Sequence, residues 1–269
     1  MRSILLHIDD DACLDARIAV ALDLARAFDG HVTCVQAMPF VIGMPGDLYG
    51  TIAAQMLPEF RELADKLRAR IEAHLIKEDV SWSWVQDDGP AIERLLQYTG
   101  LSDIAVIGCC DPLRKGYAPL TGDLVLRSRT PVLIVPPKAA GFDTDSPAVV
   151  AWDGSPEARR ALRAAVPLLA RSQAVTLATV REPSERKHDL PPTDGAEYLS
   201  RHGISCEIVE LPASESIARV LTDAALVRRA GYLVMGAYGH ARLLETIFGG
   251  VTRELLAHPP VPLPILACH

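Results

Sequence analysis

An internal repeat constrains this fold more than any other feature of the sequence. Each copy begins with an apolar run that ends in aspartate, at 4–9 and again at 148–153. A segment with apolar residues at helical spacing follows each run, at 14–25 and at 158–169. A repeat of this size indicates two copies of one domain rather than a solenoid.

Apolar runs alternate with helix-like segments in both copies. The first copy predicts strands over 3–8, 31–37, 80–86, 104–108 and 132–135, with helices over 12–28, 52–76 and 91–98. The second copy predicts strands over 148–153, 175–180, 207–211, 233–235 and 263–267, and helices over 158–169, 217–227 and 251–256, with a brief helix inside 181–203. This alternation is typical of a parallel sheet covered on both faces. We therefore predict an α/β fold of two tandem five-stranded parallel sheets, with domains at 1–138 and 147–269.

The final strand of each copy, 132–135 and 263–267, is apolar and is expected at a sheet edge. Proteins cover or pair such edges. We therefore predict that the halves pack as an internal pseudo-dimer through these strands. The segment 136–147 has the composition of a linker, and a further homodimer of whole chains is left open.

Composition excludes several classes of partner. The net charge of −7 gives no basic face for nucleic acid, and no apolar run reaches the roughly 18 to 20 residues of a membrane span. The N-terminus meets acidic residues too early for a signal peptide. No Cys/His cluster has zinc spacing. We expect a cytoplasmic protein with reduced thiols and no metal site formed by cysteines.

A glycine-rich stretch in the second copy carries the main functional hypothesis. An apolar run ends at Gly236, and Gly239, Gly249 and Gly250 follow before the amphipathic segment 251–256. Strand, glycine loop and helix start in this order suit a phosphate, because the first helical N–H groups are unpaired and the dipole is positive there. The alternative is that the glycines only make tight turns.

The spacing Gly236-x2-Gly239-x9-Gly249 resembles the phosphate loop of the universal stress protein family, and the chain as a whole resembles a tandem member. A hydroxyl or amide residue usually follows the last glycine in that family, whereas this chain has Gly250. The resemblance implies a Rossmann-like fold that holds ATP, with Mg²⁺ in some members, at the carboxyl ends of the strands. The missing side-chain donor leaves backbone donors in place.

The resemblance also implies roles for single residues. Asp153 would lie beside the ribose and phosphates, and the backbone of Val180 would contact adenine. Independently of the resemblance, Thr252 near the helix start and His240 and Arg242 within the loop are further candidate donors to phosphate. Each residue also has a simpler alternative. Asp153 could form a turn before the helix start at Ser155 and Pro156, and Val180 could be a core residue. The Thr252 hydroxyl could bond to its own helix, and His240 and Arg242 could be solvated loop charges.

The first copy has a degenerate version of this loop. Asp111 stands at the place of the second glycine and Thr121 at that of the third, and Pro112 removes a backbone donor. Arg114 and Lys115 could offset part of the charge of Asp111. We predict that this half does not bind nucleotide.

Two further clusters in the first copy leave alternatives open. Asp9, Asp10 and Asp11 are either a magnesium site or acidic residues favoured at a helix start. The adjacent Cys109 and Cys110 are either a redox pair or small residues that fill a strand end.

The sequence lacks the motifs of several enzyme classes, including the G-x-x-x-x-G-K phosphate loop, the G-x-S-x-G elbow and H-E-x-x-H. The leading expectation is a stress-response protein that binds ATP or a related adenine nucleotide in its C-terminal half and acts by binding and signalling. The alternatives are an interaction protein of the same fold without nucleotide, and a slow nucleotide hydrolase.

Overall fold

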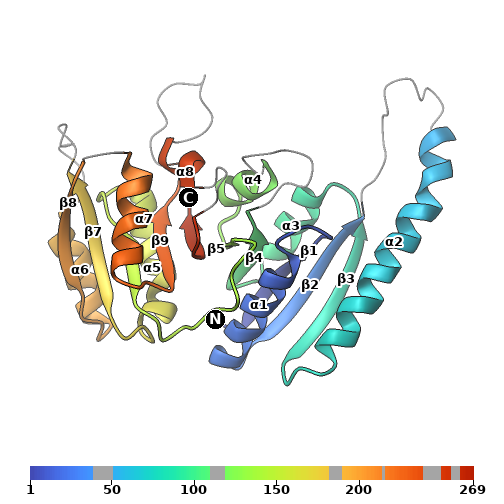
Figure 1. Cartoon of the computed structure of the whole chain (residues 1–269), viewed down its shortest axis with the longest axis horizontal. Coiled ribbons are helices and arrows are strands. Elements are labelled where there is room, and N and C mark those ends of the chain that lie inside the picture. Colours follow the sequence, from blue (N-terminus) through green and yellow to red (C-terminus); the bar gives the residue numbers. More distant parts are fainter. Residues whose placement is uncertain (39–50, 110–118, 182–189, 214–215, 239–249, 256–260) are drawn as a thin grey trace.

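The computed structural model describes residues 1–38, 51–109, 119–181, 190–213, 216–238, 250–255 and 261–269. The first half contains β1 (Ser3–Ile8), α1 (Leu14–Phe28), β2 (His31–Met38), α2 (Thr51–Leu75), β3 (Ser81–Asp88), α3 (Ala91–Thr99), β4 (Ile104–Gly108), α4 (Pro119–Arg127) and β5 (Val132–Val135). The second half contains β6 (Ala148–Ala151), α5 (Pro156–Leu169), β7 (Val175–Arg181), α6 (Pro192–Arg201), β8 (Glu207–Pro212), α7 (Ile217–Val227), β9 (Tyr232–Gly236), α8 (Gly250–Leu255) and β10 (Ile265–Cys268). Figure 1 shows both halves.

All the strands form one twisted sheet in the order β3-β2-β1-β4-β5-β10-β9-β6-β7-β8. Neighbouring strands within each half are parallel, and β5 pairs with β10 antiparallel, with Leu133 opposite Leu266. The predicted α/β fold and the pseudo-dimer through the two final strands are therefore confirmed. The domain limits 1–138 and 147–269 stay a prediction.

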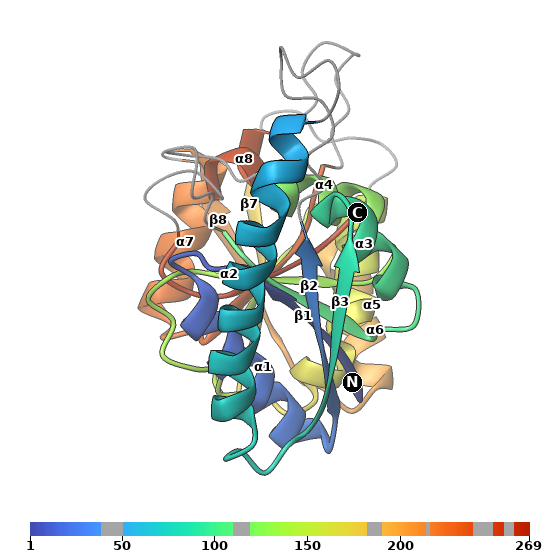
Figure 2. The ribbon, with the colours of Figure 1, turned by 90° about the vertical axis from the view of Figure 1, so that its right-hand side faces the viewer.

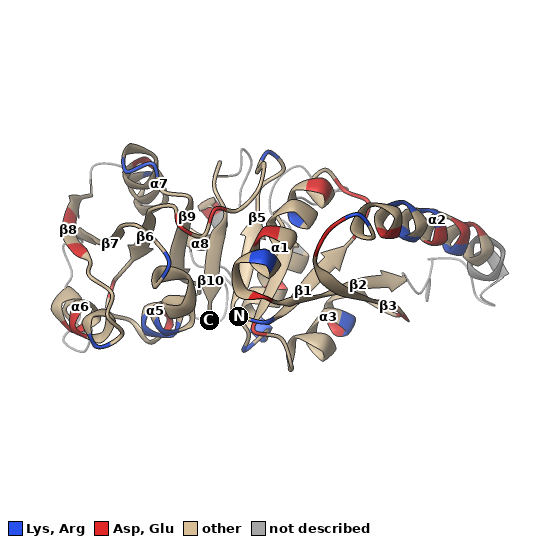
Figure 3. Cartoon of the chain, turned by 90° about the horizontal axis from the view of Figure 1, so that it is seen from below, with Lys and Arg blue, Asp and Glu red and all other residues tan. Residues whose placement is uncertain are grey.

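Helices cover both faces of the sheet, as Figure 3 shows from below. Alternate side chains of β1 enter two separate cores: Ile4 and Leu6 pack with residues of α1, and Leu5 packs with residues of α3 and α4. This is the period of two expected for a strand buried on both sides. Burial on both faces explains why the sequence of these strands is almost continuously apolar.

α2 is the longest of the described helices, with Pro58 inside it. Figures 1 and 2 show that it runs beside β2 and β3 and extends beyond their ends. Ion pairs join helical neighbours along it. Lys66 pairs with Glu62, both exposed, and Arg68 pairs with Glu72 while its guanidinium lies over the Trp84 ring of β3. The predicted loop at 39–50, which precedes this helix, lies outside the described residues.

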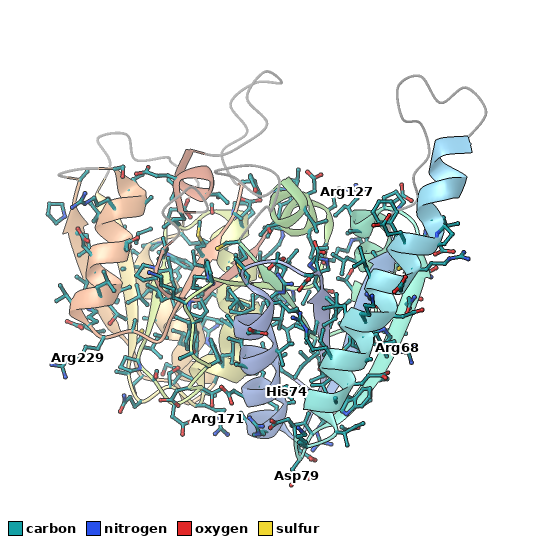
Figure 4. All side chains as sticks on the ribbon, turned by 45° about the vertical axis from the view of Figure 1, so that its right-hand side comes forward. Arg68, His74, Asp79, Arg127, Arg171 and Arg229 are labelled. Atoms are coloured by element: carbon teal, nitrogen blue, oxygen red, sulfur yellow. The ribbon has the colours of Figure 1, made fainter. Side chains whose placement is uncertain are left out.

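The predicted linker is an ordered strap that contacts both halves. Phe142 is buried against Tyr232 of β9, with ring centroids 5.3 Å apart, and its backbone N–H donates to Asp23 Oδ2 of α1 at 2.9 Å. Arg171 donates to Thr144 of the strap at 2.9 Å, and its guanidinium lies over the ring of Phe28 in the first half. Figure 4 shows Arg171 at the end of the molecule remote from α4 and α8. The strap therefore ties the halves together at that end.

Candidate functional site

The candidate site lies where the strand order of the second half changes direction. The chain passes from β6 outward to β7 and β8, then returns to β9 and β10 on the other side of β6. Open α/β sheets bind ligands outside the carboxyl ends of the strands at such a switch point. Asp153 follows β6 and Gly236 ends β9, so these two predicted residues flank the switch point. Val180 lies near the end of the next strand, β7.

The N-terminal turn of α5 packs directly on Gly236. A Cβ added to Gly236 would lie 2.4 Å from the backbone nitrogen of Ala158 and 2.9 Å from Cβ of Glu157. No real side chain tolerates such a distance from backbone, so glycine is required here for close packing. The Glu157 carboxylate is paired with Arg160 at 3.0 Å, which offsets its charge beside the site.

Asp153 has the turn-forming role that was one of its two predicted roles. Its carboxylate accepts a hydrogen bond from the Ser155 N–H at 3.0 Å, across Gly154 with φ of +72°. Ser155 then caps α5 by accepting from the Ala158 N–H at 3.2 Å, and Pro156 occupies the first turn. The side chain of Asp153 is nevertheless exposed, so this turn does not close it off from a ligand.

Val180 is half-buried and, like Leu211, packs against the border of the core that contains Ala178. This is the packing role that an isolated valine was expected to have. Its implied backbone contact to adenine stays a prediction.

Tyr238 and His269 are two residues at the site that the sequence reasoning missed. Tyr238 adopts a left-handed backbone conformation, with φ of +62°, immediately after β9. Such a conformation is rare for a bulky residue, and strain of this kind concentrates at ligand sites and switches. The His269 ring lies edge-on to the Tyr238 ring at 6.4 Å, and its Nδ1 is 3.0 Å from the Ala237 carbonyl oxygen. The position of this bulky residue between Gly236 and Gly239 is the sequence signal that could have indicated Tyr238.

The predicted phosphate loop falls partly outside the described residues. Gly239, His240, Arg242 and Gly249 lie outside the described residues. Gly250 begins α8, and Thr252 is buried within that helix at 3 % exposure. The burial of Thr252 favours a role inside the helix packing. Its predicted phosphate contact is untested.

The equivalent switch point in the first half contains a buried ion pair. Arg17 Nη1 donates to Asp11 Oδ2 at 2.6 Å and Oδ1 at 2.8 Å, and Nη2 donates to the Asp9 carbonyl oxygen at 2.9 Å. Burial, followed by the charge of Asp11, raises the pKa of Asp9. Burial, and then the charge of Arg17, lowers the pKa of His7 to about 3, so this imidazole is neutral.

The described part of the chain does not support a magnesium site at the three aspartates. It contains no group of three or more His, Cys, Asp or Glu residues placed so that they could hold a metal ion. Asp11 binds Arg17, and Asp10 pairs with Arg70 of α2 at 2.7 Å. The alternative, acidic residues at a helix start, fits better, because the Asp11 carboxylate also accepts from the Cys13 N–H at 2.6 Å.

The rest of the degenerate loop in the first half is only partly described. Thr121 lies within α4 and donates to the Gly108 carbonyl oxygen at 2.7 Å. Asp111, Pro112, Arg114 and Lys115 lie outside the described residues. Cys109 is a buried thiol and Cys110 lies outside the described residues, so the redox alternative is untested. Among the described helices, none combines the length and apolar content that a membrane span requires.

Comparison with known proteins agrees with this geometry. The family model described as "Universal stress protein family" matches residues 146–266. A universal stress protein from Archaeoglobus fulgidus DSM 4304 is 14 % identical over 98 % of this chain and 97 % of its own, with a TM-score of 0.72. A functionally unknown protein from Pseudomonas aeruginosa PAO1 is 17 % identical over 100 % of this chain and 92 % of its own, with a TM-score of 0.59.

No match was found among curated proteins. At these identities the two structural likenesses show a shared fold that spans both halves. Residues 146–266 therefore form a domain that matches the universal stress protein family, and the N-terminal half has a similar fold.

Proposed function

We propose that the C-terminal half binds ATP or a related adenine nucleotide, with or without Mg²⁺, and that the protein acts by binding and conformational signalling in a stress response. Asp153 would lie beside the ribose and phosphates, the backbone of Val180 would contact adenine, and Gly236 would begin the phosphate loop. The loop residues Gly239, His240, Arg242, Gly249 and Gly250, with Thr252, would hold the phosphates. We also propose a cytoplasmic location, because the N-terminal segment is too acidic for a signal peptide and the sequence has no apolar run as long as a membrane span.

One observation carries this proposal. The switch point between β6 and β9 is lined by a glycine, an exposed aspartate and the N-terminal turn of a 14-residue helix. A helix N-terminus and the adjoining glycine loop supply backbone donors to an anion. The strained backbone of Tyr238 at the entry to the loop supports a functional constraint there.

Purified protein provides the direct test. Nucleotide released on denaturation, read by absorbance and identified by chromatography, would support the proposal. Incubation with labelled ATP then separates three outcomes: no binding, binding without turnover, and binding with turnover. The first would favour the non-nucleotide interaction protein and the third the slow hydrolase.

A charge variant tests the location of the phosphates. Replacing Gly239 with Asp puts a carboxylate beside them, and the repulsion of about 1 to 4 kcal/mol predicts roughly 5- to 1000-fold weaker ATP binding. Gly100→Asp is the matched control, because it adds the same charge where the nearest atom to a new Cβ is 3.8 Å away. Equal affinities in the two folded variants would remove the loop from the proposal.

A second candidate function rests on Gly250. The usual hydroxyl or amide side chain at this place is absent, which favours an interaction protein of the same fold that binds no nucleotide. Gly250→Ser restores the hydroxyl. Tighter ATP binding in this variant supports the nucleotide site, whereas no binding in either protein supports the second candidate.

A further inference from the structure

The two halves have equivalent switch points with different contents. The pairing of β1 with β4 has the same register as that of β6 with β9: Ile4 lies opposite Ile104, and Ala148 lies opposite Tyr232. This register makes Asp9 equivalent to Asp153 and Gly108 equivalent to Gly236. Each glycine packs against the start of the helix that follows the first strand of its half, at Cys13 before α1 and at Glu157 and Ala158 of α5.

In the first half the guanidinium of Arg17 fills the space beside Gly108. A Cβ on Gly108 would lie 2.5 Å from Arg17 Nη1 and 2.6 Å from Cβ of Cys13. The side chains of Arg17 and Asp11 are 1 % and 4 % exposed. The offset that relates Asp9 to Asp153 also relates Asp11 to Ser155 and Arg17 to Ala161. The second half therefore has no charged side chain at either of these two positions.

The surroundings of the Asp11 carboxylate are those of an anion site. It accepts from the guanidinium of Arg17 and from the Cys13 N–H, which precedes α1, a helix of 15 residues. An arginine fork and a helix N-terminus both favour carboxylate or phosphate. A buried nitrogen of the same guanidinium, Arg17 Nε, has no hydrogen-bond partner within the described ranges. Arg17 therefore has a donor that Asp11 does not use.

We propose that the N-terminal half contains an anion site formed by Arg17 and the start of α1, and that the Asp11 carboxylate occupies it from within the chain. Removal of that carboxylate would leave a buried, unpaired guanidinium that takes a small oxyanion such as inorganic phosphate. The internal occupant leaves the switch point of the second half as the one open to a ligand. This last consequence alone rests on the proposed nucleotide function.

The test measures whether phosphate stabilises the full chain of Asp11→Ser. This variant copies the serine of the second half. Urea midpoints are compared in inorganic phosphate and in chloride at equal ionic strength. A ligand that binds only the folded state raises the folding equilibrium constant about tenfold for each tenfold rise in its concentration above Kd. We expect this dependence in Asp11→Ser and not in the wild type.

Two controls separate a site from the general stabilisation that phosphate gives by exclusion from protein surfaces. Asp10→Ser removes a neighbouring carboxylate whose partner, Arg70, is exposed, and it should behave as the wild type. Asp11→Ser combined with Arg17→Met removes the cation, so the specific dependence should disappear. Buried ion pairs often tolerate such apolar replacement.

Equal phosphate dependence in Asp11→Ser, Asp10→Ser and the wild type would overturn the proposal. If Asp11→Ser does not fold in chloride, recovery of its circular dichroism spectrum by phosphate is the readout, and failure to recover also counts against the site. Asp11→Asn, which keeps the acceptor for the Cys13 N–H, gives a second folded variant with the same expectation. None of these outcomes depends on ATP, so the anion site and the nucleotide function fail separately.

Discussion

At the scale of single residues, buried polar groups lie near the end of β1 in the first half. Arg17 is fully buried on the face of α1 that also carries Leu14 and Ala21. Breaking a buried ion pair by removing one partner costs about 3 to 5 kcal/mol, since an uncompensated charge remains. His7 belongs to the same region and stays neutral because it is desolvated and close to Arg17.

His7 should make the protein less stable in mild acid. Its folded pKa of about 3 lies below the unfolded value of 6.5. The unfolded chain therefore binds a proton first, and stability present above pH 6.5 is lost as the pH falls towards 3. The loss is about 1.4 kcal/mol per pH unit, or about 2 kcal/mol between pH 7 and pH 5. We expect His7→Gln to flatten this part of the pH profile of urea unfolding.

The exposed His202 gives the matched control for this measurement. His202→Gln should retain the slope of the wild type between pH 7 and pH 5. A His7→Gln profile as steep as that of the wild type would show that other groups cause the acid sensitivity.

At the scale of helices and strands, the sequence predicted elements whose signals are local. α5 was predicted because Ser155 and Pro156 form a helix start and apolar residues follow at helical spacing. α4 was missed, because Thr121, Gly122 and Asp123 in its first turns read as a loop, and the burial of its Leu124 depends on tertiary packing. Local propensity could not predict that packing.

The candidate site shows the same limit. Its glycines and aspartate were found because their spacing is visible in the sequence, whereas the Arg17–Asp11 pair was missed. Arg17 shares one helix face with Leu14 and Ala21, and a charged residue on an apolar face was the signal that could have revealed it. The sequence could not predict that Asp11 is the carboxylate that pairs with Arg17, because this depends on the three-dimensional structure.

Gly236 should not tolerate a side chain. Gly236→Ala places a methyl group 2.4 Å from the Ala158 nitrogen, so the first turn of α5 must move. Overpacking of this kind costs about 1 to 3 kcal/mol, and the displaced helix start should also weaken ATP binding if the proposed site is correct. Urea unfolding and ATP titration of the variant measure the two effects. Gly100→Ala, where the site is open, should leave both unchanged within error.

At the scale of the whole molecule, the two halves share one sheet and both of the cores that flank it. β5 and β10 pair across the junction, and a single core cluster runs from Leu24 of α1 through Phe142 of the strap to Tyr232 of β9. Separation of the halves would expose an apolar strand edge on each side and uncover Phe142. The halves therefore depend on each other for burial, although each has the topology of one unit.

We predict that the chain unfolds in one cooperative transition in which Phe142 contributes as core. The calorimetric and van't Hoff enthalpies of the wild type should agree, which is the test of two-state behaviour. Phe142→Ala removes a ring that contacts both halves and should cost about 3 to 5 kcal/mol, as for other buried phenylalanines. In a chain of this size that loss lowers Tm by roughly 6 to 10 °C.

Two variants show whether this effect belongs to the junction. Phe142→Leu keeps apolar volume at the same place and should lose less than about 1.5 kcal/mol. Phe60→Ala removes the same ring from α2, where the side chain is half-buried and distant from the strap, and its Tm should fall less than that of Phe142→Ala. Two resolved transitions in the wild type, or equal losses at Phe142 and Phe60, would mean that the halves are stable independently and that the strap is only a tether.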